Sequence, residues 1–86
     1  MNDAGIDERP AAAGIPLAMA KVGERSRVLR ISGQEATRKH LGELGFVPGA
    51  IVSVVMAMDG NLIIAIHDSR IAVNRDVSRH VHVELL

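Results

Sequence analysis

Two histidines and a glutamate near the end of the chain are the residues whose types and spacing could hold a metal ion. His80, His82 and Glu84 alternate with apolar residues. On a β-strand they would point to one face, because successive side chains alternate between the two faces. Two imidazoles and a carboxylate are suitable ligands for Zn(II) or Fe(II). The spacing therefore predicts a candidate metal site formed by these three residues.

An ordinary strand explains the same pattern, and we favour that interpretation. Val81 and Val83 stand between the polar residues, so a strand with its valines in the core leaves a polar outer face by default. Three ligands from one strand also cannot surround an ion, and the fourth position would need water or a neighbouring molecule. We therefore expect no required cofactor and at most weak binding of Fe(II) or Zn(II).

Composition weighs against catalysis and against nucleic-acid binding. The serines have no histidine and acid partners at motif spacing, and the absence of cysteine excludes thiolate sites and disulfides. The 10 basic and 10 acidic residues give a formal net charge of zero, and Phe46 is the only aromatic residue. Nucleic-acid-binding barrels need a basic groove and stacking rings. We expect a protein that is not an enzyme and does not bind nucleic acid.

The length of 86 residues predicts one small domain. Residues 1–15 are rich in alanine, glycine and charge without periodicity, so we interpret them as a flexible tail before a domain over 16–86. The chain begins with acidic residues and has no long apolar run. We therefore expect no signal peptide, no membrane insertion and a cytoplasmic location.

Alternating apolar residues and turn signals predict a mostly β domain. Asp59 and Gly60 form a type I′ hairpin signal, and a second tight turn is expected at Asp68 and Ser69. Short strands joined by tight turns favour a small five-stranded barrel, which removes most exposed strand edges. The expected strands cover residues 25–32, 50–58, 61–67, 70–73 and 80–86.

One α-helix is expected after the first of these strands. Ser32 as N-cap and Glu35 three residues later match a capping box. Thr37, Leu41 and Leu44 share one face of this helix. In the second long strand, alternation places Met56 and Met58 on the face of the core valines, where methionine is a common filler.

The helix is followed by two backbone turns. Gly45 is expected to be left-handed, which would place Phe46 against Leu41. Pro48 and Gly49 then fit the two corners of a type II turn, because proline presets φ and glycine tolerates positive φ. These residues end the helix and direct the chain into a strand.

Gly42 lies inside the helix, where glycine costs about 1 kcal/mol relative to alanine. With His40 and Glu43 it would leave a small accessible patch suited to the close approach of a partner. Gly42 could equally relieve crowding against the barrel of the protein itself. The sequence leaves both explanations open.

The most specific pattern contains Leu41, Leu44, Gly45, Pro48 and Gly49, followed by the hairpin and by "RIAV" at 70–73. Over residues 17 to 85 the chain resembles the FeoA family. Ala20 departs from the pattern, because the family usually has leucine there. The resemblance implies an SH3-like barrel with one helix inserted after the first strand. It also implies a small cytosolic accessory protein of bacterial ferrous iron transport.

The partner implied by the resemblance is a membrane ferrous iron transporter of the FeoB type, through its cytoplasmic GTP-hydrolysing domain. We therefore expect an interaction module that regulates this transporter. The alternative is a transition-metal sensor or carrier that uses its surface histidines. The face that binds the partner, the direction of regulation and weak homo-oligomerisation are not fixed by the sequence.

Overall fold

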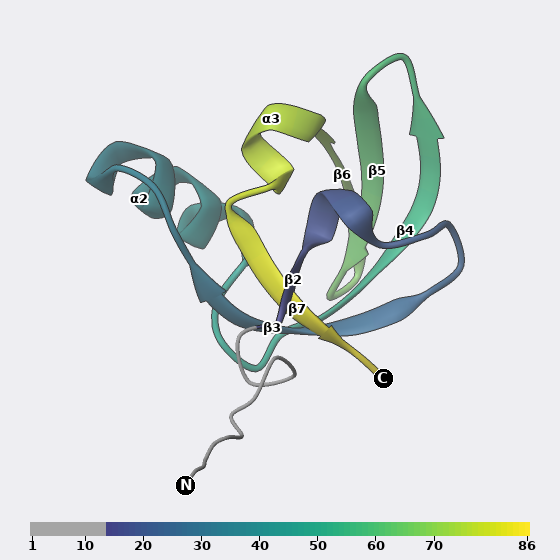
Figure 1. Cartoon of the computed structure of the whole chain (residues 1–86), viewed down its shortest axis with the longest axis horizontal. Helices are drawn as coiled ribbons and strands as arrows, with labels where there is room; N and C mark the ends of the chain where they lie inside the picture. Colours follow the sequence, from purple (N-terminus) through teal and green to yellow (C-terminus); the bar gives the residue numbers. More distant parts are fainter. Residues whose placement is uncertain (1–13) are drawn as a thin grey trace, which may run out of the picture.

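A curled antiparallel sheet forms the body of the protein (Figure 1). The structure is a computed structural model that describes residues 14–86. Residues 1–13, most of the expected tail, lie outside the described part. The strands run in the spatial order β2-β7-β3-β4-β5-β6, and every neighbouring pair is antiparallel. They are β2 (Ile15–Pro16), β3 (Arg25–Ile31), β4 (Ile51–Met58), β5 (Asn61–Ile66), β6 (Ser69–Asn74) and β7 (Val81–Leu85).

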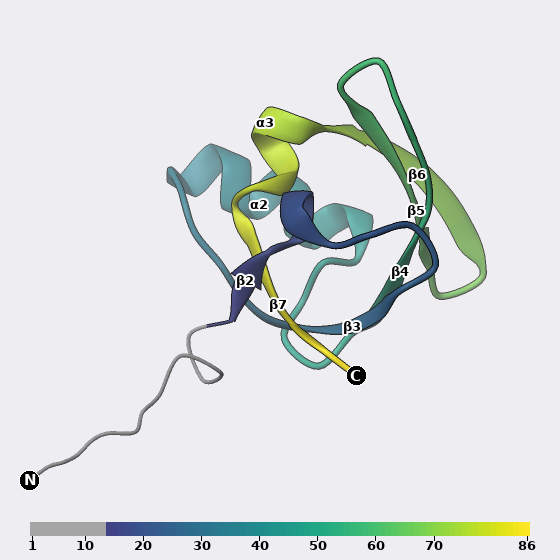
Figure 2. The same ribbon diagram turned by 45° about the vertical axis from the view of Figure 1, so that its right-hand side comes forward.

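Three short helical segments complete the described chain. The α-helix α2 (Glu35–Leu44) follows β3, as expected, and projects to one side of the sheet (Figure 1). The 3₁₀ turn η1 (Leu17–Met19) and the single turn α3 (Arg75–Ser78) lie together between the two ends of the sheet (Figure 2). The Arg75 guanidinium donates to the carbonyl of Ala18 at 3.0 Å and joins them.

The predicted fold class is confirmed: the protein is mostly β, SH3-like, with a helix after the first long strand. The two-residue strand β2 adds a sixth strand to the five expected, and the sheet ends at β2 and β6 without closing. The core is almost entirely aliphatic, as the composition requires. Its most buried large side chains are Phe46, Leu17, Leu41, Leu62, Ile64, Ile66, Val28, Val52, Val54, Val81 and Val83.

Bulges in β3 and β4 change which side chains face the core. The pairing of β4 with β5 shifts between Val54 and Met56, so one extra residue breaks the alternation. Val54 is 1% exposed, whereas Met56 and Met58 are 45% and 53% exposed. The expectation that these methionines pack in the core is therefore wrong. A similar shift between Val28 and Arg30 in β3 leaves Val28 buried and Arg30 exposed.

The start of α2 also differs from the expectation. Gln34, not Ser32, is the N-cap, and it makes no side-chain capping bond. The Ser32 amide donates to the carbonyl of His80 at 2.8 Å, which keeps this residue in the β3–β7 ladder. Its hydroxyl faces the histidines of β7 and cannot cap the helix. Gly33, with φ of +101°, makes the turn between strand and helix.

The end of α2 is as expected. Gly45 is left-handed, with φ of 109°, and the Phe46 amide donates to the Leu41 carbonyl at 3.0 Å. This is the Schellman pattern, and it holds Phe46 and Leu41 in the same buried cluster. The Ala50 amide then bonds to the carbonyl of Val47 at 3.0 Å, which closes the predicted type II turn.

Of the two later turns, the first lies where it was expected and the second is displaced by one residue. Asp59 and Gly60 both have positive φ, as a type I′ hairpin requires. The next two-residue turn consists of His67 and Asp68, so Ser69 already belongs to β6. We expected this turn one residue later, at Asp68 and Ser69, because histidine rarely adopts positive φ.

A buried hydroxyl without a partner offers a stability test. Ser26 is 1% exposed, and its Oγ makes no hydrogen bond in the described structure. An unsatisfied buried polar group costs about 1 to 3 kcal/mol, so Ser26→Ala should stabilise the fold by about 1 kcal/mol in urea denaturation. Ser78 is the matched control, because its equally buried Oγ donates to the Arg75 carbonyl at 2.9 Å. Ser78→Ala should destabilise the fold, and a loss of stability in both variants would contradict the prediction.

Candidate functional site

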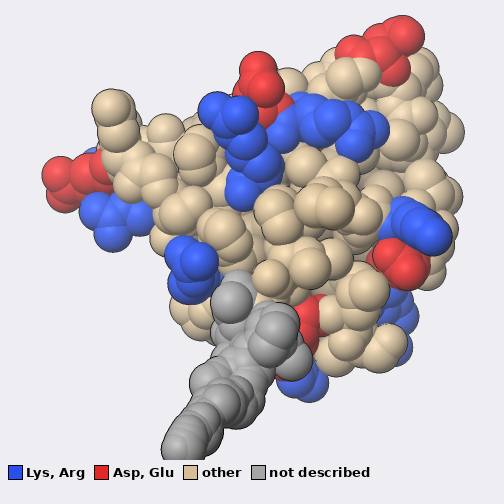
Figure 3. All heavy atoms as spheres, in the orientation of Figure 1, with Lys and Arg blue, Asp and Glu red and all other residues tan. Residues whose placement is uncertain are grey.

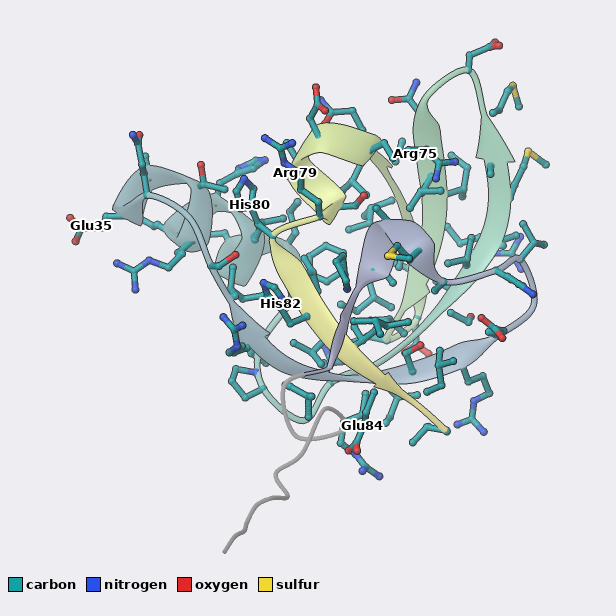
Figure 4. All side chains as sticks on the ribbon, viewed as in Figure 1. Glu35, Arg75, Arg79, His80, His82 and Glu84 are labelled. Atoms are coloured by element: carbon teal, nitrogen blue, oxygen red, sulfur yellow. The ribbon has the colours of Figure 1, made fainter. Side chains whose placement is uncertain are left out.

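The outer face of the β3–β7 ladder carries a row of polar cross-strand pairs (Figure 4). Arg30 lies opposite His82, and Arg27 lies opposite Glu84. The row continues past the strand end, where the Ser32 amide bonds to the carbonyl of His80. Alternation brings His82 and Glu84 to one face of β7, and the bulge between Val28 and Arg30 brings Arg27 and Arg30 to the same face of β3.

Two of the three predicted metal ligands meet at the hydroxyl of Ser32. Its Oγ lies 3.4 Å from Nδ1 of His80 and 3.0 Å from Nε2 of His82. All three side chains are partly buried, so the cluster remains open to solvent. We call Ser32, His80 and His82 the serine–histidine cluster. The carboxylate predicted to complete the site is not part of it.

Glu84 is occupied elsewhere. Its Oε2 accepts a hydrogen bond from the Arg27 guanidinium at 2.8 Å, and both side chains are partly exposed. Figure 4 shows Glu84 at the far end of β7 from His80. Within residues 14–86, no three His, Cys, Asp or Glu side chains gather closely enough to hold a metal ion. The three predicted ligands thus lie on one strand face as a row and not as a cluster.

The surroundings of His82 favour its neutral form. Partial burial, followed by the positive charge of Arg30 and the proximity of His80, holds the pKa of His82 below its ordinary value of 6.5. Burial disfavours an imidazolium because a charged ring loses hydration, and a neighbouring guanidinium repels it. The neutral ring can accept a hydrogen bond from the Ser32 hydroxyl.

A pH dependence of stability follows from this lowered pKa. Between the folded pKa of His82 and 6.5, the unfolded chain binds more protons than the folded chain. The lowered pKa of His82 therefore stabilises the folded chain fully above pH 6.5, and this stabilisation is lost as the pH falls through the pKa of His82 in the folded chain. The free energy of unfolding, measured by urea denaturation at several pH values across this range, should depend less steeply on pH in His82→Gln than in wild type. His40→Gln, on the exposed side of α2, is the control. An equal pH dependence of the free energy of unfolding in wild type and His82→Gln would contradict the prediction.

The predicted partner patch lies on α2. His40 and Glu43 are exposed, and Gly42 is partly buried. A Cβ placed on Gly42 would have no heavy atom within 4 Å outside its own helix neighbourhood. Crowding against the barrel therefore does not explain this glycine. The position is accessible, so a partner could approach the helix backbone closely there.

Sequence reasoning missed Ser32 and Arg30 as neighbours of the histidines. Arg30 lies in β3 and Ser32 directly follows it, while His80 and His82 lie about 50 positions later, so only the pairing of β3 with β7 brings them together. The available signal was the alternation of Arg30 and Ser32, which matches the spacing of the two histidines. An antiparallel pairing of the first and last strands would have predicted the contact.

Comparison with protein-family models decides what kind of protein this is. The model of the FeoA domain matches residues 15–85, nearly the whole described chain. The chain belongs to the FeoA family. This membership supports a role as an accessory protein in ferrous iron transport. A comparison with curated proteins finds no match.

Solved structures of FeoA proteins share the fold. A crystal structure of an iron uptake regulatory protein, FeoA, is 30% identical, covers 84% of this chain and 96% of its own, and has a TM-score of 0.78. A FeoA-like protein from Clostridium acetobutylicum is 16% identical, with 86% and 88% covered and a TM-score of 0.80. FeoA of Stenotrophomonas maltophilia in complex with zinc, described as an SH3 domain protein, is 23% identical, with 79% and 87% covered and a TM-score of 0.71.

No helix within residues 14–86 is long and apolar enough to cross a membrane. On the face shown in Figure 3, the basic side chains over α3 have acidic side chains beside them.

Proposed function

We propose that this FeoA-family protein is a cytoplasmic interaction module that docks to the cytoplasmic domain of a FeoB-type ferrous iron transporter. Family membership supports the link to ferrous iron transport. The second support is the form of the chain, a small SH3-like barrel, a scaffold on which binding surfaces are common.

The accessible glycine on α2 is the observation that carries the proposed docking face. Gly42 weakens its helix, yet nothing in the barrel requires a glycine there. His40 and Glu43 flank it with one hydrogen-bonding ring and one negative charge, both exposed. The Schellman turn fixes the end of this helix, because its hydrogen bond joins Phe46 to Leu41 and both side chains belong to the buried core. We define the docking face as His40, Gly42 and Glu43.

The test is direct binding between the full chain and the purified cytoplasmic domain of the transporter from the same organism. Isothermal titration calorimetry, repeated with nucleotide-free and GTP-analogue-loaded domain, should give saturable binding in at least one state. GTP hydrolysis and iron uptake, measured with and without the accessory protein, then give the direction of regulation. Absence of binding in every nucleotide state, with a correctly folded chain, would overturn the proposal.

A further inference from the structure

We propose that the serine–histidine cluster is a binding site for a divalent transition metal ion such as Zn(II), held by Nδ1 of His80, Nε2 of His82 and the hydroxyl oxygen of Ser32. This assignment removes Glu84 from the set expected from the sequence and adds Ser32, which directly follows β3. It is independent of the proposed docking face. The supporting observations are the convergence of the two nitrogens, the rigidity of the backbone beneath them and the chemistry of the ligands.

The convergence depends on the use of different ring nitrogens. His80 presents Nδ1, the nitrogen nearer to its backbone, and His82 presents Nε2, the more distant one. Both lie within 3.4 Å of the same oxygen, although His80 directly precedes β7 and His82 lies within it. Two ligands that each lie about 2.1 Å from one ion at a tetrahedral angle are about 3.4 Å apart, so both nitrogen–oxygen separations are compatible with a shared ion.

The backbone beneath the cluster is fixed by the sheet. The Ser32 amide donates to the His80 carbonyl at 2.8 Å, and the neighbouring register pairs Arg30 with His82. Gly33 leaves room for the His80 ring, because a Cβ there would lie 3.1 Å from Nδ1 of His80. The absence of that Cβ keeps the coordinating nitrogen clear, so an ion could bind without rearrangement of the chain.

The ligands suit a borderline metal ion, with modest affinity. Neutral imidazoles bind Zn(II), Ni(II) and Co(II) well, whereas a serine hydroxyl is a weak donor. Water would fill the remaining coordination positions, and the partly buried cluster leaves access for it. Arg30 carries a positive charge opposite His82 and would reduce the affinity for any cation.

Nitrogen-resolved NMR of the wild-type chain provides the first test. During titration with ZnCl₂, long-range ¹H–¹⁵N spectra should show coordination shifts at Nδ1 of His80 and at Nε2 of His82. The nitrogens of His40 and His67 should not shift. Binding through the opposite ring nitrogens, shifts at all four histidines, or no saturable shift would each overturn the proposal. This measurement needs no variant and is unaffected by any change in folding.

Variants give the second test by calorimetry with ZnCl₂. His80→Gln and His82→Gln should each weaken binding about tenfold or more, because each removes one of two strong ligands. Glu84→Gln should leave the affinity unchanged, and Arg30→Gln should raise it about two- to fivefold by removing a nearby positive charge. His40→Gln is the matched control. Equal losses in Glu84→Gln and His82→Gln, or wild-type affinity in the double histidine variant, would reject this site.

Discussion

Replacing Gly45 with valine is expected to destabilise the protein by about 2 to 4 kcal/mol, the largest effect we expect from a substitution outside the buried core. Two terms contribute. Gly45 has φ of +109°, where a β-branched side chain is strained. A Cβ there would also lie 3.2 Å from Cδ1 of Ile66 and 3.3 Å from Cδ2 of His67, so these two side chains would have to shift by a few tenths of an ångström. Urea denaturation monitored by circular dichroism measures the sum.

Gly49→Val separates the two terms. Gly49 also has positive φ, +93°, but a Cβ there would meet nothing within 4 Å. This variant should therefore show only the backbone term, about 1 to 2 kcal/mol. The difference between the two variants measures the steric conflict of Gly45 with Ile66 and His67. Equal destabilisation would mean that this conflict costs nothing, and a stable Gly45→Val would contradict the role of Gly45 in ending α2.

The features that sequence reasoning predicted correctly are those set by a few neighbouring residues. Gly45, the Pro48–Gly49 turn and the Asp59–Gly60 hairpin each need a particular φ that few residues accept, so their identity predicts the conformation. These local signals, with strand alternation, predicted a small barrel with one helix, and the resemblance to the FeoA family implied that it is SH3-like.

The features that were missed depend on pairing between distant segments. The exposure of Met56 follows from a bulge, and alternation within one strand cannot reveal a register shift against its neighbour. Ser32 fits a capping box locally, but its hydroxyl faces histidines about 50 positions away. The candidate metal site changed for the same reason, because Arg27 on β3 holds Glu84.

Replacing Gly42 with arginine is expected to weaken capture of the transporter's cytoplasmic domain about tenfold or more, because a long charged side chain would occupy the centre of the docking face. The fold should survive, since a Cβ at Gly42 has open space and arginine is a better helix former than glycine. Calorimetric binding, the melting temperature and the far-ultraviolet spectrum are the measurements. Iron uptake in cells carrying this variant should fall in parallel, if docking activates transport.

Ala36→Arg is the matched control for charge and size. Ala36 is exposed on the same helix, and six residues at 3.6 per turn place it about 120° around the axis from Gly42. The same side chain added there should leave binding unchanged if the docking face is specific. Equal weakening by both variants would indicate a general effect of positive charge. If Gly42→Arg folds and binds normally, His40, Gly42 and Glu43 are not the docking face, and the exposed arginines of β3 become the surface to test.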